Sequence, residues 1–233
     1  MSYLSTDKYK DEFMAKKGVI FDFNGTLLWD TQLHNMAWDI FLKKYGISLS
    51  DEEKHQRIHG RLNSEIMMNL FDNKLTSEKM DRCILEKETI YQRLCTELDD
   101  FSLAEGTIAL FEKLKKNKIP FVIATAADLV NVEFYIRTLG LYKWFEKEHI
   151  IYNDGTVRGK PFPDIFLKAF DVLGIDGKDT VIFEDSISGV KAAEAANAGK
   201  IVIVNSNDSD YTEYRDKYSI INKFNEVNLD WFK

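Results

Sequence analysis

The chain has 233 residues, of which 45% are hydrophobic and 30% are charged, and its formal net charge is −7. This composition is typical of a globular protein with a substantial core. The acidic balance argues against a general nucleic-acid binder, which needs a basic face. No apolar run is long enough to cross a membrane, and the polar N-terminus lacks the apolar segment of a signal peptide. We therefore expect a cytoplasmic protein in which Cys83 and Cys95 are reduced thiols.

Short apolar runs rich in β-branched or aromatic residues predict strands. None of them alternates cleanly between apolar and polar residues, so each is expected to be buried on both faces, as in a parallel sheet. These runs are Gly18–Phe23, Ile119–Thr125, Thr180–Asp185 and Lys200–Ser206. Apolar residues at helical spacing separate the last three, in the segments Asp128–Phe145, Asp164–Ile175 and Ser186–Gly199. Strands that alternate with helices predict an α/β, doubly wound parallel sheet.

A long insert separates the first two predicted strands. It has about a hundred residues, far more than the dozen that a crossover needs. Thr31–Gly46 is amphipathic, Thr76–Leu98 is a long charged helix, and Ser50 and Glu53 have the spacing of a capping box. The pattern predicts a small helical domain at residues 31–99. Residues 1–30 and 100–233 are then expected to form the α/β core.

Polar side chains follow the predicted strands at the points where they end. In an open parallel sheet, ligands bind beyond the carboxyl ends of the strands. The residues expected there are Asp22, Thr125, Glu184 and Asp185, with Lys160 in a loop ahead of a helix. Each of these residues alone has an ordinary structural explanation, as a turn former, a helix cap or a solvated loop residue. The functional hypothesis depends on their falling together at one edge of the sheet.

Such a cluster has a chemical meaning. Crowded carboxylates repel one another unless a cation neutralises them, and hard oxygen ligands suit Mg²⁺. Lys160, the Thr125 hydroxyl and free N–H groups of the turn Asn24-Gly25-Thr26 are the groups expected to hold an anion beside that cation. A metal, an anion and an adjacent carboxylate predict phosphoryl transfer with Asp22 as the nucleophile.

The segments FDFNGTLL, IAT, GKPFPDIF and IFEDSISGVKAAEAANAG resemble the four ordered motifs of the haloacid dehalogenase superfamily. The helical insert resembles the α-helical cap of its first subgroup, and DTQLHNMAWDIFLKKYGI resembles the opening cap helix of the β-phosphoglucomutase-like branch. The resemblance implies that Asp22 accepts the phosphoryl group and that Thr125 and Lys160 bind it. It places Mg²⁺ on Asp22, Glu184, Asp185 and the main-chain carbonyl of Asn24. The substrate-binding residues expected in addition are Gly25, Thr26, Ala126, His34 and Arg61.

One position departs from the family pattern. The family's phosphatases and mutases carry an acid two residues after the nucleophile, which moves a proton to and from the leaving oxygen; here the residue is Asn24. An amide donates a hydrogen bond but carries no proton at neutral pH. Restoring an acid by Asn24→Asp is therefore expected to raise turnover of sugar phosphates by about 10²–10⁴-fold.

Three explanations of Asn24 stay open at this point. The enzyme acts on substrates with good leaving groups, or another group such as His34 carries the proton. The protein is a weakly active or inactive relative that binds a phosphorylated metabolite. Or the amide is not the native residue, and an Asn-Gly pair is also prone to deamidation.

The function expected from the sequence is a Mg²⁺-dependent phosphohydrolase that acts on a small phosphorylated metabolite through an aspartyl-phosphate intermediate. The alternatives are a β-phosphoglucomutase-like sugar-phosphate mutase and a catalytically weak phosphometabolite-binding protein. Asn63 stands where mutases carry a cap arginine, and Asp128 stands where they carry a lysine and would repel a second phosphate. We expect a monomer or weak dimer, with neither nucleic acid nor a membrane as a partner.

Overall fold

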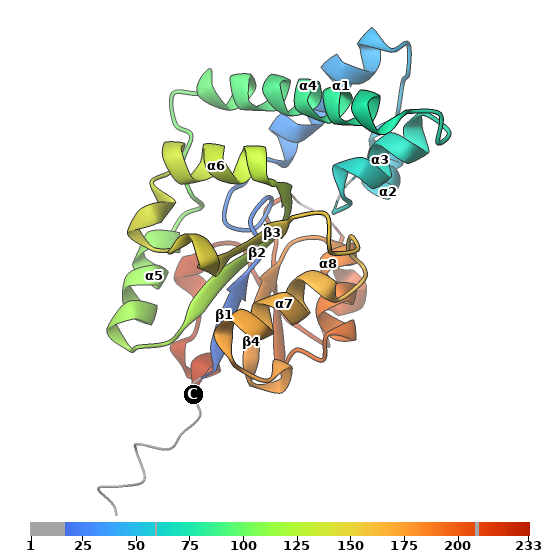
Figure 1. The fold of residues 1–233 in the computed structure, drawn as a ribbon. Coiled ribbons are helices and arrows are strands. Elements are labelled where there is room, and N and C mark those ends of the chain that lie inside the picture. Colours follow the sequence, from blue (N-terminus) through green and yellow to red (C-terminus); the bar gives the residue numbers. More distant parts are fainter. Residues whose placement is uncertain (1–16, 59, 208–209) are drawn as a thin grey trace, which may run out of the picture.

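The computed structural model describes residues 17–58, 60–207 and 210–233, and a parallel β-sheet lies at its centre (Figure 1). Its strands are β1 (Gly18–Phe21), β2 (Phe121–Asp128), β3 (Ile150–Asn153), β4 (Thr180–Glu184), β5 (Lys200–Val204) and β6 (Ser219–Ile221). The strand order is β3-β2-β1-β4-β5-β6, and every neighbouring pair is parallel. The predicted doubly wound α/β fold is confirmed.

Helices cover both faces of this sheet, which explains why its strands are apolar throughout. The helices are α5 (Thr107–Lys116), α6 (Leu129–Thr138), α7 (Asp164–Leu173) and α8 (Ile187–Ala195). Figure 1 shows α5 and α6 on one side of the sheet, with α7 and α8 on the other. Because side chains alternate along a strand, Val19 and Phe21 of β1 pack with Phe111 of α5, whereas Ile20 packs with Phe166 of α7.

Further helices stand between β1 and α5 in the chain, and we call them the inserted helices. They are α1 (Thr31–Lys44), α2 (Asp51–Arg57), α3 (Asn63–Leu70) and α4 (Ser77–Thr96). Trp38, Phe41 and Met67 belong to a hydrophobic cluster of their own. The predicted capping box is confirmed: Ser50 Oγ accepts from the N–H of Glu53, and the Glu53 carboxylate accepts from the N–H of Ser50. The domain boundaries at residues 31 and 99 stay a prediction.

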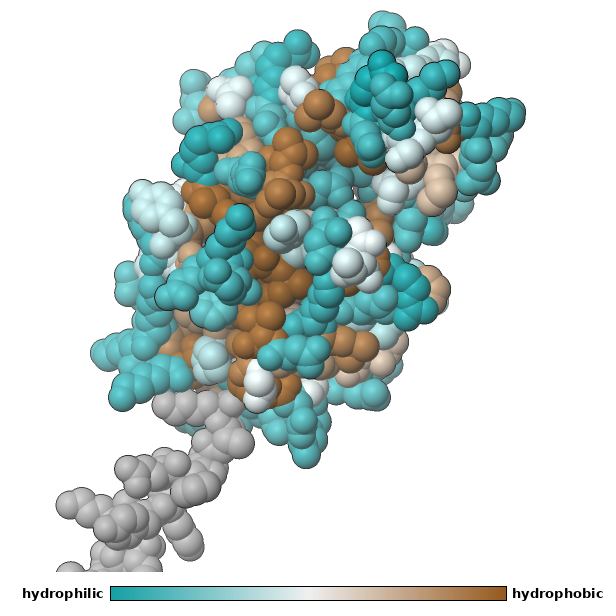
Figure 2. Space-filling view, viewed as in Figure 1, coloured by the Kyte–Doolittle hydropathy of each residue, from teal (hydrophilic) through white to brown (hydrophobic). Residues whose placement is uncertain are grey.

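The inserted helices lie beyond the end of the sheet at which β1 stops (Figure 1). Figure 2 shows a mostly hydrophilic surface on this side of the molecule, with hydrophobic side chains gathered in a band along its middle. Cys83 and Cys95 are both buried free cysteines. Among the described residues, none of the helices is long and apolar enough to cross a membrane.

The structure corrects several sequence-based element assignments. Strands β3 and β6 were not predicted, because three or four residues are too few to establish a periodicity. The helix predicted over Asp128–Phe145 ends at Thr138, since Gly140 adopts a left-handed conformation with φ of 64°. Strand β2 runs on to Asp128, past the predicted end at Thr125, through a register irregularity beside β3.

The aromatic cluster against β1 gives a test of this packing. Phe111 is fully buried, and its ring lies 5.6 Å from that of Phe21 and 5.2 Å from that of Phe121. Phe111→Ala is expected to lower the free energy of unfolding by about 3–5 kcal/mol, because it leaves a cavity in a close-packed core. Urea unfolding measures this loss. The control Tyr142→Ala removes a ring that is 68% exposed and should change stability by no more than about 0.5 kcal/mol; equal losses would contradict the packing described here.

Candidate active site

Three buried carboxylates meet at the carboxyl ends of β1 and β4. Asp22 directly follows β1, Glu184 is the last residue of β4, and Asp185 comes next. Because β1 and β4 are hydrogen-bonded neighbours, their ends are adjacent in space. One oxygen from each carboxylate lies within 4.8 Å of the others. The sequence-predicted cluster is thus brought together as expected.

Lys160 joins two of these carboxylates. Its Nζ donates to Asp22 Oδ1 and to Glu184 Oε1, both at 2.6 Å, and the residue is 4% exposed. Burial alone would lower the pKa of Lys160, but the charges of Asp22 and Glu184 raise it above its ordinary value. A permanently charged ammonium therefore balances one of the three negative charges that a fully ionised cluster would carry.

The remaining negative charge makes the cluster suitable for a cation. Burial raises the pKa of Asp22 to about 7, with the charge of Glu184 acting in the same direction and Lys160 opposing it. Burial, Glu184 and Asp22 together raise the pKa of Asp185 well above its ordinary value. Burial is the main cause in both cases, and a bound cation would favour the ionised forms. The cluster therefore offers a set of hard oxygen donors that fits a divalent cation such as Mg²⁺.

The turn after Asp22 is closed upon itself, which corrects one expectation. The Gly25 N–H donates to Leu28 O at 2.7 Å, and the Thr26 N–H donates to Phe23 O at 3.2 Å. We expected the N–H groups of the turn Asn24-Gly25-Thr26 to be free for an anion, but those of Gly25 and Thr26 are occupied within the turn. Thr26 is fully buried, and its hydroxyl donates to Asp185 Oδ1 at 3.1 Å. Gly25 and Thr26 therefore pack against Asp185 of the carboxylate cluster.

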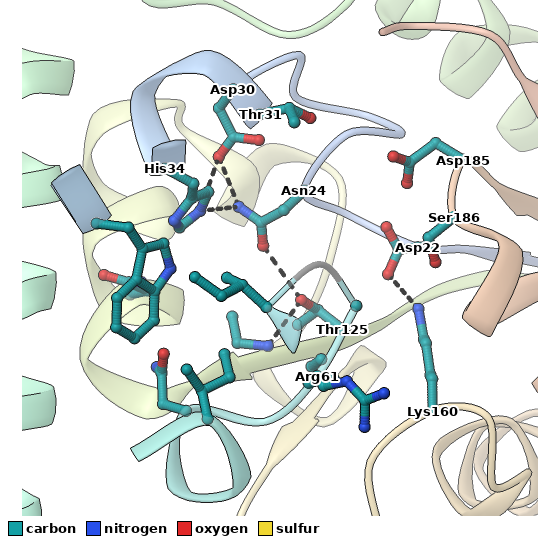
Figure 3. Close-up of a pocket in the computed structure, with 18 of the residues that line it drawn as sticks. Asp22, Asn24, Asp30, Thr31, His34, Arg61, Thr125, Lys160, Asp185 and Ser186 are labelled. Atoms are coloured by element: carbon teal, nitrogen blue, oxygen red, sulfur yellow. Dashed lines mark hydrogen bonds and ion pairs between the residues drawn. The ribbon is translucent and has the colours of Figure 1, made fainter. Parts of the chain in front are cut away.

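The Asn24 side chain points away from the carboxylate cluster, toward the inserted helices (Figure 3). Its Nδ2 donates to Asp30 Oδ2 and to the Tyr135 hydroxyl, both at 2.7 Å. Its Oδ1 faces the Thr125 hydroxyl at 3.4 Å. Both amide hydrogens are therefore engaged, and the amide presents its oxygen on the Thr125 side.

Asp30 receives this amide and was not predicted as a site residue. It is 1% exposed and also accepts from the Tyr91 hydroxyl and from the N–H of Gly25. Burial alone would raise the pKa of Asp30, but His34 and the hydrogen bonds from His34, Tyr91 and Asn24 lower it below its ordinary value. Asp30 is therefore an ionised carboxylate buried in a ring of donors.

His34 lies between a carboxylate and an ammonium. Its Nδ1 is 2.9 Å from Lys87 Nζ, and its Nε2 is 3.3 Å from Asp30 Oδ2. An ammonium has no acceptor, so Nδ1 accepts and Nε2 carries the hydrogen that faces Asp30. The imidazole ring stacks on Tyr91 with the ring centroids 3.8 Å apart. These contacts place His34 beside Asn24, on the wall of the pocket.

One pocket contains most of the predicted site residues. Thr125, Ala126, His34 and Arg61 line it together with Asp22, Asn24, Lys160, Glu184 and Asp185. Arg61 borders the pocket with its guanidinium donating to Gln56 O at 3.1 and 3.2 Å. The lining residues that the sequence did not single out come from both the inserted helices and the core. Those on the inserted helices are Thr31, Trp38, Ile66, Lys87 and Glu88.

The far wall of the pocket is a buried polar network. Lys87 Nζ donates to Glu88 Oε1 at 3.0 Å, and Asn131 Nδ2 donates to Glu88 Oε2 at 2.6 Å. Asn63 Nδ2 reaches both Glu88 Oε1 at 2.8 Å and Asp128 Oδ2 at 2.7 Å. The contact between Asn63 and Asp128 joins α3 to the end of β2. The inserted helices therefore rest on the core above the carboxylate cluster.

Comparison with known proteins agrees with this fold and shows the family. The family model of haloacid dehalogenase-like hydrolases matches residues 16–197. The chain belongs to the haloacid dehalogenase-like hydrolase family, as the sequence motifs indicated.

Individual relatives extend the likeness. The chain is 29% identical to a phosphorylated carbohydrates phosphatase of Thermotoga maritima, over 79% of this chain and 83% of that protein. It is 27% identical to the β-phosphoglucomutase of Bacillus subtilis, over 77% and 80% of the two chains. The crystal structure of a family IA haloacid dehalogenase hydrolase from Entamoeba histolytica superposes with a TM-score of 0.80 at 36% identity, covering 92% of this chain and 96% of that one. The predicted likeness to phosphatases and β-phosphoglucomutases is confirmed.

Gly25 offers a test of how tightly the turn is packed against the cluster. Its φ is +81°, and a Cβ there would lie 2.1 Å from Asp185 Oδ2. Gly155 has a φ of +82° with no atom within 4 Å of its Cβ position, so it is a matched control. Gly155→Ala is expected to lose about 1–2 kcal/mol of unfolding free energy for its left-handed backbone. Gly25→Ala should lose clearly more in urea unfolding, because Asp185 must also move; equal losses would contradict the close approach.

Proposed function

We propose that the protein is a Mg²⁺-dependent phosphatase that hydrolyses a small phosphorylated metabolite with Asp22 as the nucleophile. The observation that carries the proposal is the buried Lys160 ammonium, which holds one oxygen of Asp22 inside a cluster of three carboxylates. The relatives named as phosphatases of phosphorylated carbohydrates support this function. The expected monomer or weak dimer, and the cytoplasm as its compartment, stay predictions.

Each residue of the cluster has a proposed role. Asp22 attacks phosphorus through the oxygen that Lys160 does not hold, and Lys160 and the Thr125 hydroxyl bind the transferred phosphoryl group. Asp22, Glu184, Asp185 and the main-chain carbonyl of Asn24 would hold Mg²⁺. When bound, the cation offsets negative charge on the phosphoryl oxygens. Ala126 lies beside Thr125 in the pocket lining and completes the proposed phosphate side.

The far side of the pocket supports a phosphatase over a sugar-phosphate mutase. A mutase must hold a second phosphate, which requires positive charge opposite the first. Lys87 is the buried cation of this wall, and it is already paired with Glu88 at 3.0 Å. Asp128 is held by Asn63 and adds negative charge beyond it. Neither Lys87 nor Asp128 offers free positive charge to a second phosphate, so this wall supports a substrate with one phosphate. Arg61, whose guanidinium donates to the Gln56 carbonyl, and His34 border the space for the rest of the substrate.

Asn24 sets the expected rate. Its two amide hydrogens are donated to Asp30 and Tyr135, so the amide has neither a proton to transfer nor a free N–H for the leaving oxygen. Loss of a general acid typically slows such a step by about 10²–10⁴-fold. We therefore propose slow turnover of sugar phosphates and faster turnover of acyl phosphates, whose leaving groups need no proton.

The nucleophile is tested by the isosteric change Asp22→Asn. Acetyl phosphate turnover in Mg²⁺ is expected to fall by at least about 10⁴-fold, because the attacking carboxylate is removed. Circular dichroism should show an unchanged fold, since the amide fills the same volume. Turnover that survives the change at more than a few per cent of the original would reject covalent catalysis through Asp22.

The metal site is tested by calorimetric titration of the protein with Mg²⁺. Asp185→Asn is expected to weaken binding by at least about 10-fold, because a charged ligand is lost from a small donor set. The control Asp171→Asn changes an exposed carboxylate on α7 and should leave the affinity unchanged. Equal affinities in the wild type and the Asp185 variant would show that Mg²⁺ does not bind at this cluster.

A further inference from the structure

We infer that Glu65 on α3 is the positioning residue for the loop that carries Lys160. This loop, residues 158–163, lies ahead of α7 in the core, whereas Glu65 lies in the first turn of α3. The Gly159 N–H donates to Glu65 Oε1 at 3.2 Å, so the contact joins the inserted helices to the residue directly before Lys160. The kinetic part of the inference rests on the proposed function, in which Lys160 binds the phosphoryl group.

The glycine at position 159 and the carboxylate of Glu65 fit closely against each other. A Cβ on Gly159 would lie 2.7 Å from Glu65 Oε2 and 2.9 Å from Glu65 Oε1. The backbone of Gly159 is not left-handed, so an alanine there would be opposed by the carboxylate and not by its own backbone. Both oxygens of Glu65 therefore lie against the loop, and a residue without a side chain leaves room for this approach.

The loop is also shaped by bonds that do not reach the inserted helices. Arg158 donates to Asp164 through its N–H at 3.1 Å, its Nε at 2.9 Å and a terminal nitrogen at 2.7 Å. The Phe162 N–H donates to Gly159 O at 3.1 Å. These bonds close the loop and tie it to the start of α7. Among the described residues, its hydrogen bonds to other elements are those of Lys160 Nζ in the carboxylate cluster and that of Gly159 to α3.

The Gly159 N–H depends on Glu65 for its acceptor. Gly159 is buried and Glu65 is half-buried, and a buried N–H without a partner is costly. Removal of the carboxylate therefore favours movement of the loop toward water. Because Lys160 is the next residue, this movement draws its Nζ away from Asp22, to which it donates at 2.6 Å. A displacement of about 1 Å is enough to slow a catalysed step by about 10²-fold.

The first turn of α3 makes a second contact with the core. Asn63, two residues before Glu65, donates to Asp128 Oδ2 at the end of β2 at 2.7 Å. One helix turn therefore touches both the end of β2 and the Lys160 loop. Docking of α3 on the core holds this loop in place, so the inserted helices act on the site through the core's lysine as well as through their own pocket residues.

Amide hydrogen exchange tests the contact without any activity. Nuclear magnetic resonance follows the Gly159 N–H in the wild type, Glu65→Ala and Glu65→Gln. Glu65→Ala is expected to speed its exchange by at least about 10-fold because the acceptor is lost, whereas the amide oxygen of Glu65→Gln should keep it within about 3-fold of the wild type. The Arg158 N–H, which donates to Asp164, should change by no more than about 3-fold. Unchanged exchange at Gly159, or equal acceleration at both N–H groups, would overturn the inference.

Kinetics with acetyl phosphate and Mg²⁺ test the positioning of Lys160. Glu65→Ala is expected to lower kcat by about 10-fold or more, and Glu65→Gln to retain at least about a third of it, because only the alanine loses the acceptor. The control Glu78→Ala removes a carboxylate on α4 that is 82% exposed and should leave kcat unchanged. Circular dichroism should show the same fold in every variant. A kcat in Glu65→Ala equal to the wild type, or an equal loss in Glu65→Gln, would overturn the inference.

Gly159→Ala completes a double-mutant cycle. With Glu65 present, the added methyl group pushes against the carboxylate, so kcat is expected to fall by about 10-fold. In Glu65→Ala the same change meets no carboxylate and should lower kcat by no more than about 2-fold further. Additive losses would overturn the inference, because they would show that the two residues act independently.

The two proposals fail in different ways. If Asp22→Asn retains acetyl phosphate turnover, the proposed function fails, and the exchange of the Gly159 N–H still decides whether Glu65 holds the loop. If Asp22→Asn abolishes turnover while Glu65→Ala leaves both turnover and exchange unchanged, the proposed function stands and the inference fails.

Discussion

The ion pairs of Lys160 are the interaction on which the rest of this site depends. A buried ammonium between Asp22 and Glu184, at 2.6 Å from each, ties the loop before α7 to the ends of β1 and β4. Removing one partner of a buried ion pair typically costs about 3–5 kcal/mol, because a charge is left without compensation. The same contact holds one oxygen of Asp22. One interaction therefore contributes to stability and also orients the proposed nucleophile.

A second buried network surrounds the amide of Asn24. It joins Asn24 and Tyr135 of the core to Asp30, His34 and Tyr91 at the inserted helices. In this network the carboxylate of Asp30 lies at the start of α1 and the amide of Asn24 lies two residues after Asp22. The amide donates a hydrogen bond that the carboxylate accepts. Under the proposed function, the carboxylate cluster would hold and attack a phosphoryl group, while the position that would deliver a proton to the leaving oxygen carries an amide.

The sequence predicted the parts of the site that the sheet alone positions. Parallel strands bring their carboxyl ends to one edge, so Asp22, Thr125 and Glu184 could be placed together from the order of the strands. Asp30 could not, because an acid ahead of a helix is typical of an N-cap, yet here it makes no capping hydrogen bond and faces Asn24 instead. Lys87 and Glu88 lie on α4, where the residues that face the pocket depend on how the inserted helices pack on the core.

The central claim, that Asp22 takes up the phosphoryl group within this cluster, is tested most directly by trapping the intermediate. The protein is mixed with acetyl phosphate and Mg²⁺, quenched in acid within the first turnover, digested and sequenced by mass spectrometry, since acyl phosphates survive acid better than base. The account predicts a phosphoryl group on Asp22 that disappears on treatment with hydroxylamine. Steady turnover with the phosphoryl group on another carboxylate, or with none on the protein at any quench time, would contradict it.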